Sequence, residues 1–137
     1  MRPMLTTLLV LIGVALGFYV LMCAFLYFEQ DRVLFHPLPN DRALVERWAP
    51  HRVEIPSGNH ALEGWWANNS ASTSNLVAIY FGGNAEDVLF TASTVERFDV
   101  SRMLVVNYRG YGRSPGTPSQ DALYEDALAI YDYVIAS

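Results

Sequence analysis

The sequence contains no lysine, a single cysteine and only three histidines. Its nine basic residues are therefore all arginines, and 14 acidic residues give a net charge of −5. Nucleic acids bind mainly to clustered basic side chains, so we expect no nucleic-acid partner. The lone Cys23 excludes an internal disulfide. His36, His51 and His60 lie far apart without cysteine or acidic ligands around them, so we expect no metal site and no cofactor.

Charged residues are also absent from residues 3–28. As a helix this stretch would be roughly 39 Å long, enough to cross the ~30 Å hydrocarbon core of a bilayer. We interpret residues 1–28 as a transmembrane anchor whose partner is the lipid bilayer. A cleaved signal peptide is the alternative, because Ala15-Leu16-Gly17 resembles a cleavage site. The apolar run continues for eleven residues after Gly17, which favours the anchor.

The flanking charges predict the orientation of the anchor. Arg2 and the α-amino group precede it, and Glu29, Asp31 and Arg32 follow it. The positive-inside rule then favours a cytoplasmic N-terminus and an extracytoplasmic domain, as in a single-pass protein of the bacterial inner membrane.

After the anchor we expect a linker over residues 29–50, with a short helix at 42–48, and a partial domain over residues 51–137. Arg52-Val53-Glu54-Ile55 alternates polar and apolar residues, and Pro56-Ser57-Gly58-Asn59 has turn chemistry. Residues 61–67 follow as a second strand. Together these segments predict an antiparallel hairpin.

A parallel βαβ unit is predicted over residues 76–106. Residues 76–81 and 103–106 are short apolar runs typical of strands covered on both faces. One helix is expected between them, because apolar residues recur there at helical spacing: Val88, Leu89, Ala92, Val95 and Phe98. A second amphipathic helix should follow a capping box at Thr117–Gln120 with Pro118 at its first position, and its inner face is Leu123, Ala127, Ile130 and Val134.

Chemistry in such a unit is expected at the carboxyl ends of its strands, in the loops at 82–86 and 108–114. Taken alone, Gly82-Gly83-Asn84 is most simply a tight turn in which Asn84 caps the next helix. A phosphate-binding loop is a weaker alternative, because neither glycine-rich fingerprint is present. Glu86 and Asp87 suit a helix N-terminus, and Arg109 and Arg113 either hold their loop or meet an anionic substrate, the first being favoured.

Two segments carry a family resemblance: Tyr80-Phe81-Gly82-Gly83-Asn84-Ala85-Glu86 and the run Asn107-Tyr108-Arg109-Gly110-Tyr111-Gly112-Arg113-Ser114-Pro115-Gly116-Thr117-Pro118-Ser119. They resemble the turn after the third strand and the loop after the fourth strand of α/β-hydrolases, in the membrane-anchored branch called serine-aminopeptidase-like or lysophospholipase-like. The resemblance covers about residues 29–137. It departs from the usual family pattern at Gly82, where histidine is common, and at Asn107, where aspartate is usual.

The resemblance implies an α/β fold: a transmembrane helix, then the first half of an α/β-hydrolase sheet that ends before the nucleophile strand. It also implies that the backbone N–H of Asn84 is one donor of an oxyanion hole, with Gly82 and Gly83 allowing close approach to the substrate. The reaction would be serine-dependent hydrolysis of a small ester, thioester or amide substrate in the full-length relative.

Gly112-Arg113-Ser114-Pro115-Gly116 matches the G-x-S-x-G nucleophile motif, but we reject Ser114 as the nucleophile. The residue after a nucleophile donates its N–H to the oxyanion, and Pro115 has none. All three histidines also precede Ser114, against the order of the α/β-hydrolase triad. Two hypotheses follow for the chain: an N-terminal portion of a serine hydrolase that is inactive alone, or a catalytically inert single-pass membrane protein that acts through binding.

Overall fold

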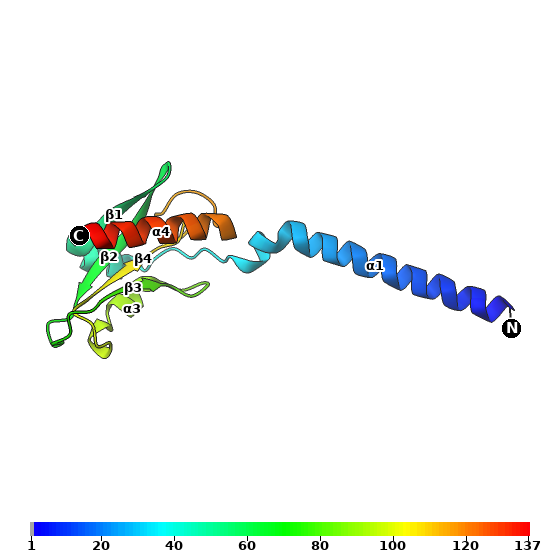
Figure 1. Cartoon of the computed structure of the whole chain (residues 1–137), viewed down its shortest axis with the longest axis horizontal. Coiled ribbons are helices and arrows are strands. Elements are labelled where there is room, and N and C mark those ends of the chain that lie inside the picture. Colours follow the sequence, from blue (N-terminus) through cyan, green and yellow to red (C-terminus); the bar gives the residue numbers. More distant parts are fainter. Residues whose placement is uncertain (1) are drawn as a thin grey trace. The chain divides into compact units, whose positions relative to one another are not determined.

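The structure is a computed structural model that describes residues 2–137 of the chain (Figure 1). It divides into two compact units between Leu34 and Phe35. The expected boundaries at 28/29 and 50/51 are a different division, and they stay a prediction.

The first unit is one helix, α1 (Arg2–Leu34). Its leucine-rich sequence contains no charge from Pro3 to Phe28, and Pro37 follows soon after its last residue. The most apolar 18-residue window of the candidate span Pro3–Leu34 has a mean hydropathy of 2.6, so α1 is long and apolar enough to cross a membrane. The helix is longer than the expected anchor, because residues 29–34 continue it. Val33 and Leu34 are its last two residues.

The second unit is built on a four-stranded sheet in the order β1-β2-β4-β3. β1 (Arg52–Ser57) and β2 (His60–Asn68) form an antiparallel hairpin. β3 (Val77–Phe81) runs parallel to β4 (Arg102–Val106), and β4 is antiparallel to β2. The predicted hairpin and βαβ unit are thereby confirmed, and β3 lies at the sheet edge.

Helices flank this sheet. α2 (Arg42–Trp48) is capped by Asp41 and runs into the 3-10 helix η1 (Ala49–His51). α3 (Val88–Ala92) and the 3-10 helix η2 (Val95–Arg97) connect β3 to β4, and α4 (Gln120–Ala136) follows β4.

The connection between β3 and β4 differs from the single helix expected over 88–98. The hydroxyl of Ser93 donates to the carbonyl of Leu89 (2.8 Å), and that of Thr94 donates to the carbonyl of Thr91 (3.0 Å). Such local side-chain bonds compete with helix continuation, so α3 ends after Ala92.

The N-terminus of α4 also differs from the expectation of a cap at Thr117. Ser119 is the N-cap, and its hydroxyl accepts from Ala122 N–H at 3.2 Å. Pro118 thus precedes the cap instead of opening the helix.

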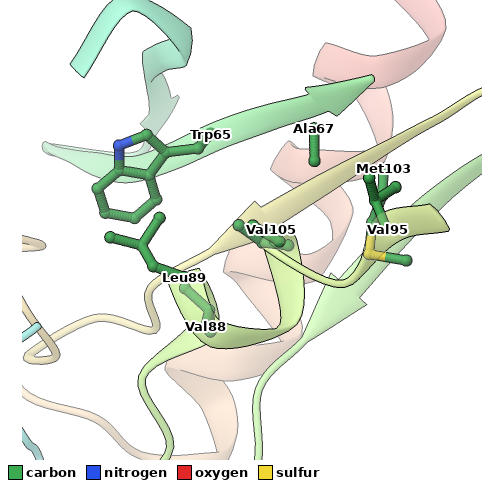
Figure 2. Packing of buried hydrophobic residues seen from close by; sticks show 8 residues of the cluster. Trp65, Ala67, Val88, Leu89, Val95, Met103 and Val105 are labelled. Atoms are coloured by element: carbon green, nitrogen blue, oxygen red, sulfur yellow. The ribbon is translucent and has the colours of Figure 1, made fainter. Parts of the chain in front are cut away.

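Two hydrophobic clusters lie on the two faces of the sheet, because successive strand residues point to opposite sides. Figure 2 shows the first, where side chains of β2 and β4 pack against α3 and η2: Trp65, Ala67, Met103 and Val105 with Val88, Leu89, Ala92 and Val95. The second places Ile130 of α4 against sheet residues of the other face: Ile55, Leu62, Leu104 and Val106. This packing fixes the carboxyl ends of β3 and β4, where the candidate site lies.

Candidate active site

The candidate site consists of two loops at the carboxyl ends of the neighbouring parallel strands. The turn after β3 covers residues 82–86, and the loop after β4 covers residues 107–116. The Tyr108 hydroxyl donates to the carbonyl of Gly82 at 2.8 Å, and its ring stacks on that of Phe81, with 6.2 Å between ring centroids. The structure therefore brings together the two loops that the sequence singled out.

The Glu86 carboxylate braces the turn after β3. It accepts hydrogen bonds from Gly83 N–H (2.6 Å), the Thr91 hydroxyl (2.7 Å) and the Tyr80 hydroxyl (3.0 Å). Burial by itself raises the pKa of Glu86, but these three bonds stabilise the carboxylate and leave the pKa below the ordinary 4.5. Glu86 thus holds the turn together, a role beyond the dipole effect expected from its place near a helix. The same contact commits the N–H of Gly83 to Glu86.

Gly82 lies against Val88, the first residue of α3. A Cβ atom at this position would lie 2.7 Å from Cγ1 of Val88, inside van der Waals contact. Gly82 is buried, whereas Gly83 and Asn84 are exposed. The packing against Val88 accounts for glycine at a place where the related motif has histidine.

Asn84 does not cap α3, in contrast to the simplest interpretation of the sequence. That role belongs to Asp87, whose carboxylate accepts from Leu89 N–H at 3.1 Å. The Asn84 side chain instead joins a polar cluster: its Oδ1 accepts from His36 N–H and from the Tyr111 hydroxyl, both at 2.9 Å. Its Nδ2 lies 3.2 Å from Nδ1 of His36.

The loop after β4 is fixed by Ser114. Its buried hydroxyl accepts from Glu63 N–H (2.9 Å) and donates to the carbonyl of Asn107 (3.0 Å). These two bonds give Ser114 a structural role and support its rejection as a nucleophile.

Asn107 belongs to a buried polar network. Its Nδ2 donates to Oδ1 of Asn40 (2.6 Å) and to Oε2 of Glu63 (3.3 Å). Glu63 is 1% exposed and pairs with Arg52, Nε to Oε1, at 2.8 Å. A neutral amide at position 107 therefore avoids a second carboxylate beside Glu63, which explains the departure from aspartate in physical terms.

Arg109 connects the same loop to α4. Its guanidinium donates to Asp126 (Nε to Oδ2, 3.1 Å) and to Glu125 (2.9 Å), and its hydrogen bond with Asp126 raises the pKa of Arg109. The Ser57 hydroxyl donates to the same aspartate at 2.6 Å. Arg109 holds the loop, as expected. Arg113 takes part through its backbone N–H, which donates to Glu63 at 3.2 Å.

Sequence reasoning missed two members of the site, His36 and Tyr111. His36 precedes Asn84 by 48 residues, and no local pattern indicates this contact. Tyr111 was part of the resembling motif, but its hydroxyl had no predicted partner. Among residues 2–137, no group of three or more histidine, cysteine or acidic side chains is placed to hold a metal ion.

Comparison with known proteins gives matches to parts of longer chains, and no family model matches. The chain is 30% identical over 101 residues to a multifunctional-autoprocessing repeats-in-toxin protein of Vibrio vulnificus, covering 66% of this chain and 2% of the toxin. It is 28% identical over 131 residues to the uncharacterised protein YfhR of Salmonella typhimurium (85% and 42% covered). An uncharacterised protein of Mycobacterium tuberculosis is 27% identical over 117 residues (80% and 41% covered).

Among solved structures, the chain resembles the crystal structure of an α/β-hydrolase from Vibrio vulnificus. The TM-score is 0.54 at 24% sequence identity, and the match covers 69% of this chain and 34% of that one. The chain thus spans 2% of the matched toxin and about two fifths of the two uncharacterised relatives. Together with the mixed sheet and its βαβ unit, this likeness shows that the chain has part of an α/β-hydrolase fold.

Proposed function

We propose that the chain is the N-terminal portion of a membrane-anchored serine hydrolase of the α/β-hydrolase fold. In this proposal the backbone N–H of Asn84 donates to the oxyanion of the tetrahedral intermediate. The second donor, the nucleophilic serine, the acid and the histidine come from a part of the protein after Ser137. The substrate class is an ester, thioester or amide.

The main support for the proposal is that hydrogen bonds and packing hold the turn after β3 in one conformation. Oxyanion donors work when they are held rigidly, because the protein then does not reorganise as charge develops. The Glu86 carboxylate accepts hydrogen bonds from three donors, one in the turn and two in the neighbouring strand and helix. Gly82 packs directly on α3. The turn also lies at the carboxyl end of a parallel strand, the usual place for chemistry in open α/β sheets.

The remaining residues of the two loops fit a site that supplies an oxyanion donor, and they argue against a complete catalytic triad within these loops. Ser114 is occupied by two buried hydrogen bonds, and no histidine follows His60 in the sequence. Gly83 cannot supply the oxyanion donor while its N–H is bound to Glu86. The N–H of Asn84, the next residue, is the donor that the family resemblance assigns.

Membrane attachment through residues 3–28, with a cytoplasmic N-terminus and an extracytoplasmic domain, is part of the same proposal. Its support is the length and hydropathy of α1 and the charges at its ends. A cleaved signal sequence is the competing interpretation. The size of the protein in isolated membranes distinguishes the two, because cleavage after Gly17 would shorten the chain and remove more than half of the apolar run.

The test of the Asn84 donor compares two substitutions in the full-length protein. Asn84→Ala and Asn84→Pro both remove the side chain, but only proline removes the N–H. Loss of one oxyanion donor lowers kcat by about 10²–10³-fold. We expect the kcat of Asn84→Pro to lie at least about 100-fold below the parental value, and below that of Asn84→Ala, at equal folded concentration. Equal kcat values in the two variants would contradict the proposal.

A catalytically inert single-pass protein that acts through binding is the second candidate. The edge strand β3 favours it, because unpaired strand edges bind other chains. A frame that ends after Ser137, together with stable expression of a product that no serine-directed probe labels, would support this candidate over the hydrolase.

A further inference from the structure

We propose that residues 36–41, which we call the brace segment, position the oxyanion turn, and that His36 and Tyr111 are positioning residues for Asn84. This inference rests on the proposed function. It adds two residues from outside the turn, one of them soon after the apolar helix in sequence.

The side-chain carbonyl of Asn84 is the point at which the two positioning residues meet. The backbone N–H of His36 donates to Oδ1 of Asn84 at 2.9 Å and lies 3.1 Å from the hydroxyl oxygen of Tyr111. That hydroxyl donates to the same Oδ1, so both lone pairs of the Asn84 carbonyl oxygen are used. The amide nitrogen faces Nδ1 of His36, which accepts when it carries no proton.

The rest of the brace segment contacts both loops of the site. Asn40 donates to Asp87, the cap of α3, at 2.6 Å, and Asp41 N–H donates to the same carboxylate at 2.7 Å. The carbonyl of Leu38 accepts from Gly112 N–H in the second loop at 3.4 Å. One short segment thus connects the start of α3, the turn and the loop after β4.

The turn itself explains why such a brace is useful. It begins with two glycines, whose backbones are the most flexible, and Ala85 adopts a left-handed conformation with φ of 60°. Glu86 fixes the turn on one side through Gly83. On the other side the Asn84 side chain is tied to His36 and Tyr111, so the backbone N–H between these two attachments keeps one direction.

Tyr111 is the side chain best suited to transmit this constraint. It is 3% exposed, and its ring makes an edge contact with Tyr108, with 5.7 Å between centroids. Tyr108 in turn donates to the carbonyl of Gly82. The turn is therefore held at its first residue and at Asn84 by two tyrosines of the neighbouring loop.

The experiment measures kcat and KM of the full-length enzyme with Tyr111→Phe, with His36→Ala, which removes the Nδ1 contact to Asn84 and keeps the backbone N–H, and with the double variant. A displacement of about 1 Å in a catalytic group can cost up to about 10²-fold, so we expect kcat to fall about 10- to 100-fold with KM within about twofold. The double variant should fall less than the product of the single losses, because both residues act on one amide. Folded sites are counted by stoichiometric labelling with a fluorophosphonate.

Matched controls separate positioning from stability. Tyr131→Phe removes a hydroxyl on the exposed face of α4, and His51→Ala removes an exposed imidazole away from the site; both should keep the parental kcat. His36→Asn supplies an acceptor near the place of Nδ1 and should restore most of the activity lost in His36→Ala.

The outcomes separate this inference from the proposed function. If Asn84→Pro loses activity relative to Asn84→Ala but Tyr111→Phe and His36→Ala keep the parental kcat, the brace is refuted and the oxyanion assignment stands. A rise in KM at constant kcat, or a loss equal to the loss of labelled sites, also refutes the brace. If the unsubstituted full-length protein has no hydrolase activity, both proposals are overturned.

Discussion

Asn107→Asp tests the buried polar network directly, because it replaces a neutral amide by the residue that is usual in the resembling family. The substitution changes one NH₂ group to an oxygen with almost no change in volume. The new carboxylate oxygen would lie about where Nδ2 lies, 3.3 Å from Oε2 of Glu63 and 2.6 Å from Oδ1 of Asn40. The two hydrogen bonds that Nδ2 donates, to Asn40 and Glu63, would each be replaced by a contact between two oxygen acceptors.

The size of the expected loss in stability follows from these distances. Two unit charges about 3–4 Å apart repel by about 4–5 kcal/mol at an effective dielectric constant of about 20. Arg52, which pairs with Glu63, offsets part of this, but its side chain is 31% exposed and partly screened. The introduced carboxyl can also take up a proton, which at about pH 7 costs about 4 kcal/mol for an ordinary aspartate and so limits the loss. We therefore expect the free energy of unfolding to fall by about 2–4 kcal/mol.

The assay is urea unfolding of the full chain in detergent, followed by tryptophan fluorescence at about pH 7 and about pH 4.5. Trp65 is buried against α3 and reports loss of the core. The destabilisation should shrink by more than about half at the lower pH, because protonation of the new carboxyl is then nearly free of cost. Asn75→Asp, the same change in an exposed loop, should shift stability by less than about 0.5 kcal/mol. An Asn107→Asp chain as stable as the parent at neutral pH, or equally destabilised at both pH values, would refute the electrostatic reasoning.

Three further predictions concern the same two loops. Gly112→Ala should lower the free energy of unfolding by more than about 2 kcal/mol in urea titrations, because φ at this position is +53° and a Cβ would overlap Nδ2 of Asn107. An unchanged free energy of unfolding would contradict the loop geometry. The pKa of Glu86 lies below its ordinary 4.5, so the stability that its carboxylate contributes is present above pH 4.5 and is lost as pH falls through the pKa of the folded state. In Glu86→Gln the free energy of unfolding should therefore fall less steeply as the pH is lowered. An equally steep fall in the variant and the parent would contradict this. Ser114→Ala should cost about 1–3 kcal/mol in the same titrations, because two buried groups lose their partner. It should also leave phosphonate labelling of the full-length protein unchanged, and mapping of the label to Ser114 would contradict our assignment.

The strands, the hairpin and the parallel pairing of β3 with β4 could be predicted from local sequence, but the pairing of β2 with β4 was not predicted. Residues 52–55 alternate polar and apolar residues, a turn follows, and residues 61–67 form the second strand. Residues 76–81 and 103–106 are short apolar runs. These patterns are nearly sufficient for a hairpin and a βαβ unit. Two helix ends could not be predicted, because hydroxyl groups and caps compete there at similar energies. Thus α3 ends early, after Ala92, and α4 is capped by Ser119 instead of Thr117.

The candidate site was predictable where it is local and was missed where it depends on distant contacts. The glycines and Asn84 follow directly from the turn motif after a strand. The partners of Asn84 and Asn107 lie far away in sequence: His36 precedes Asn84 by 48 residues, and Glu63 precedes Asn107 by 44. No periodicity or spacing encodes such contacts, which arise only when the sheet places β2 beside β4 and the brace segment contacts both loops.

The central proposal is that this chain supplies the oxyanion turn of a longer serine hydrolase. The most direct measurement is to read the coding sequence past Ser137, express the full product in membranes, label it with a fluorophosphonate and map the labelled residue. We predict one labelled serine after Ser137, in a G-x-S-x-G motif without proline, and a labelling rate of Asn84→Pro that lies at least about 100-fold below the parental rate and below that of Asn84→Ala. A folded full-length product that takes no label, or a label on Ser114, would contradict it.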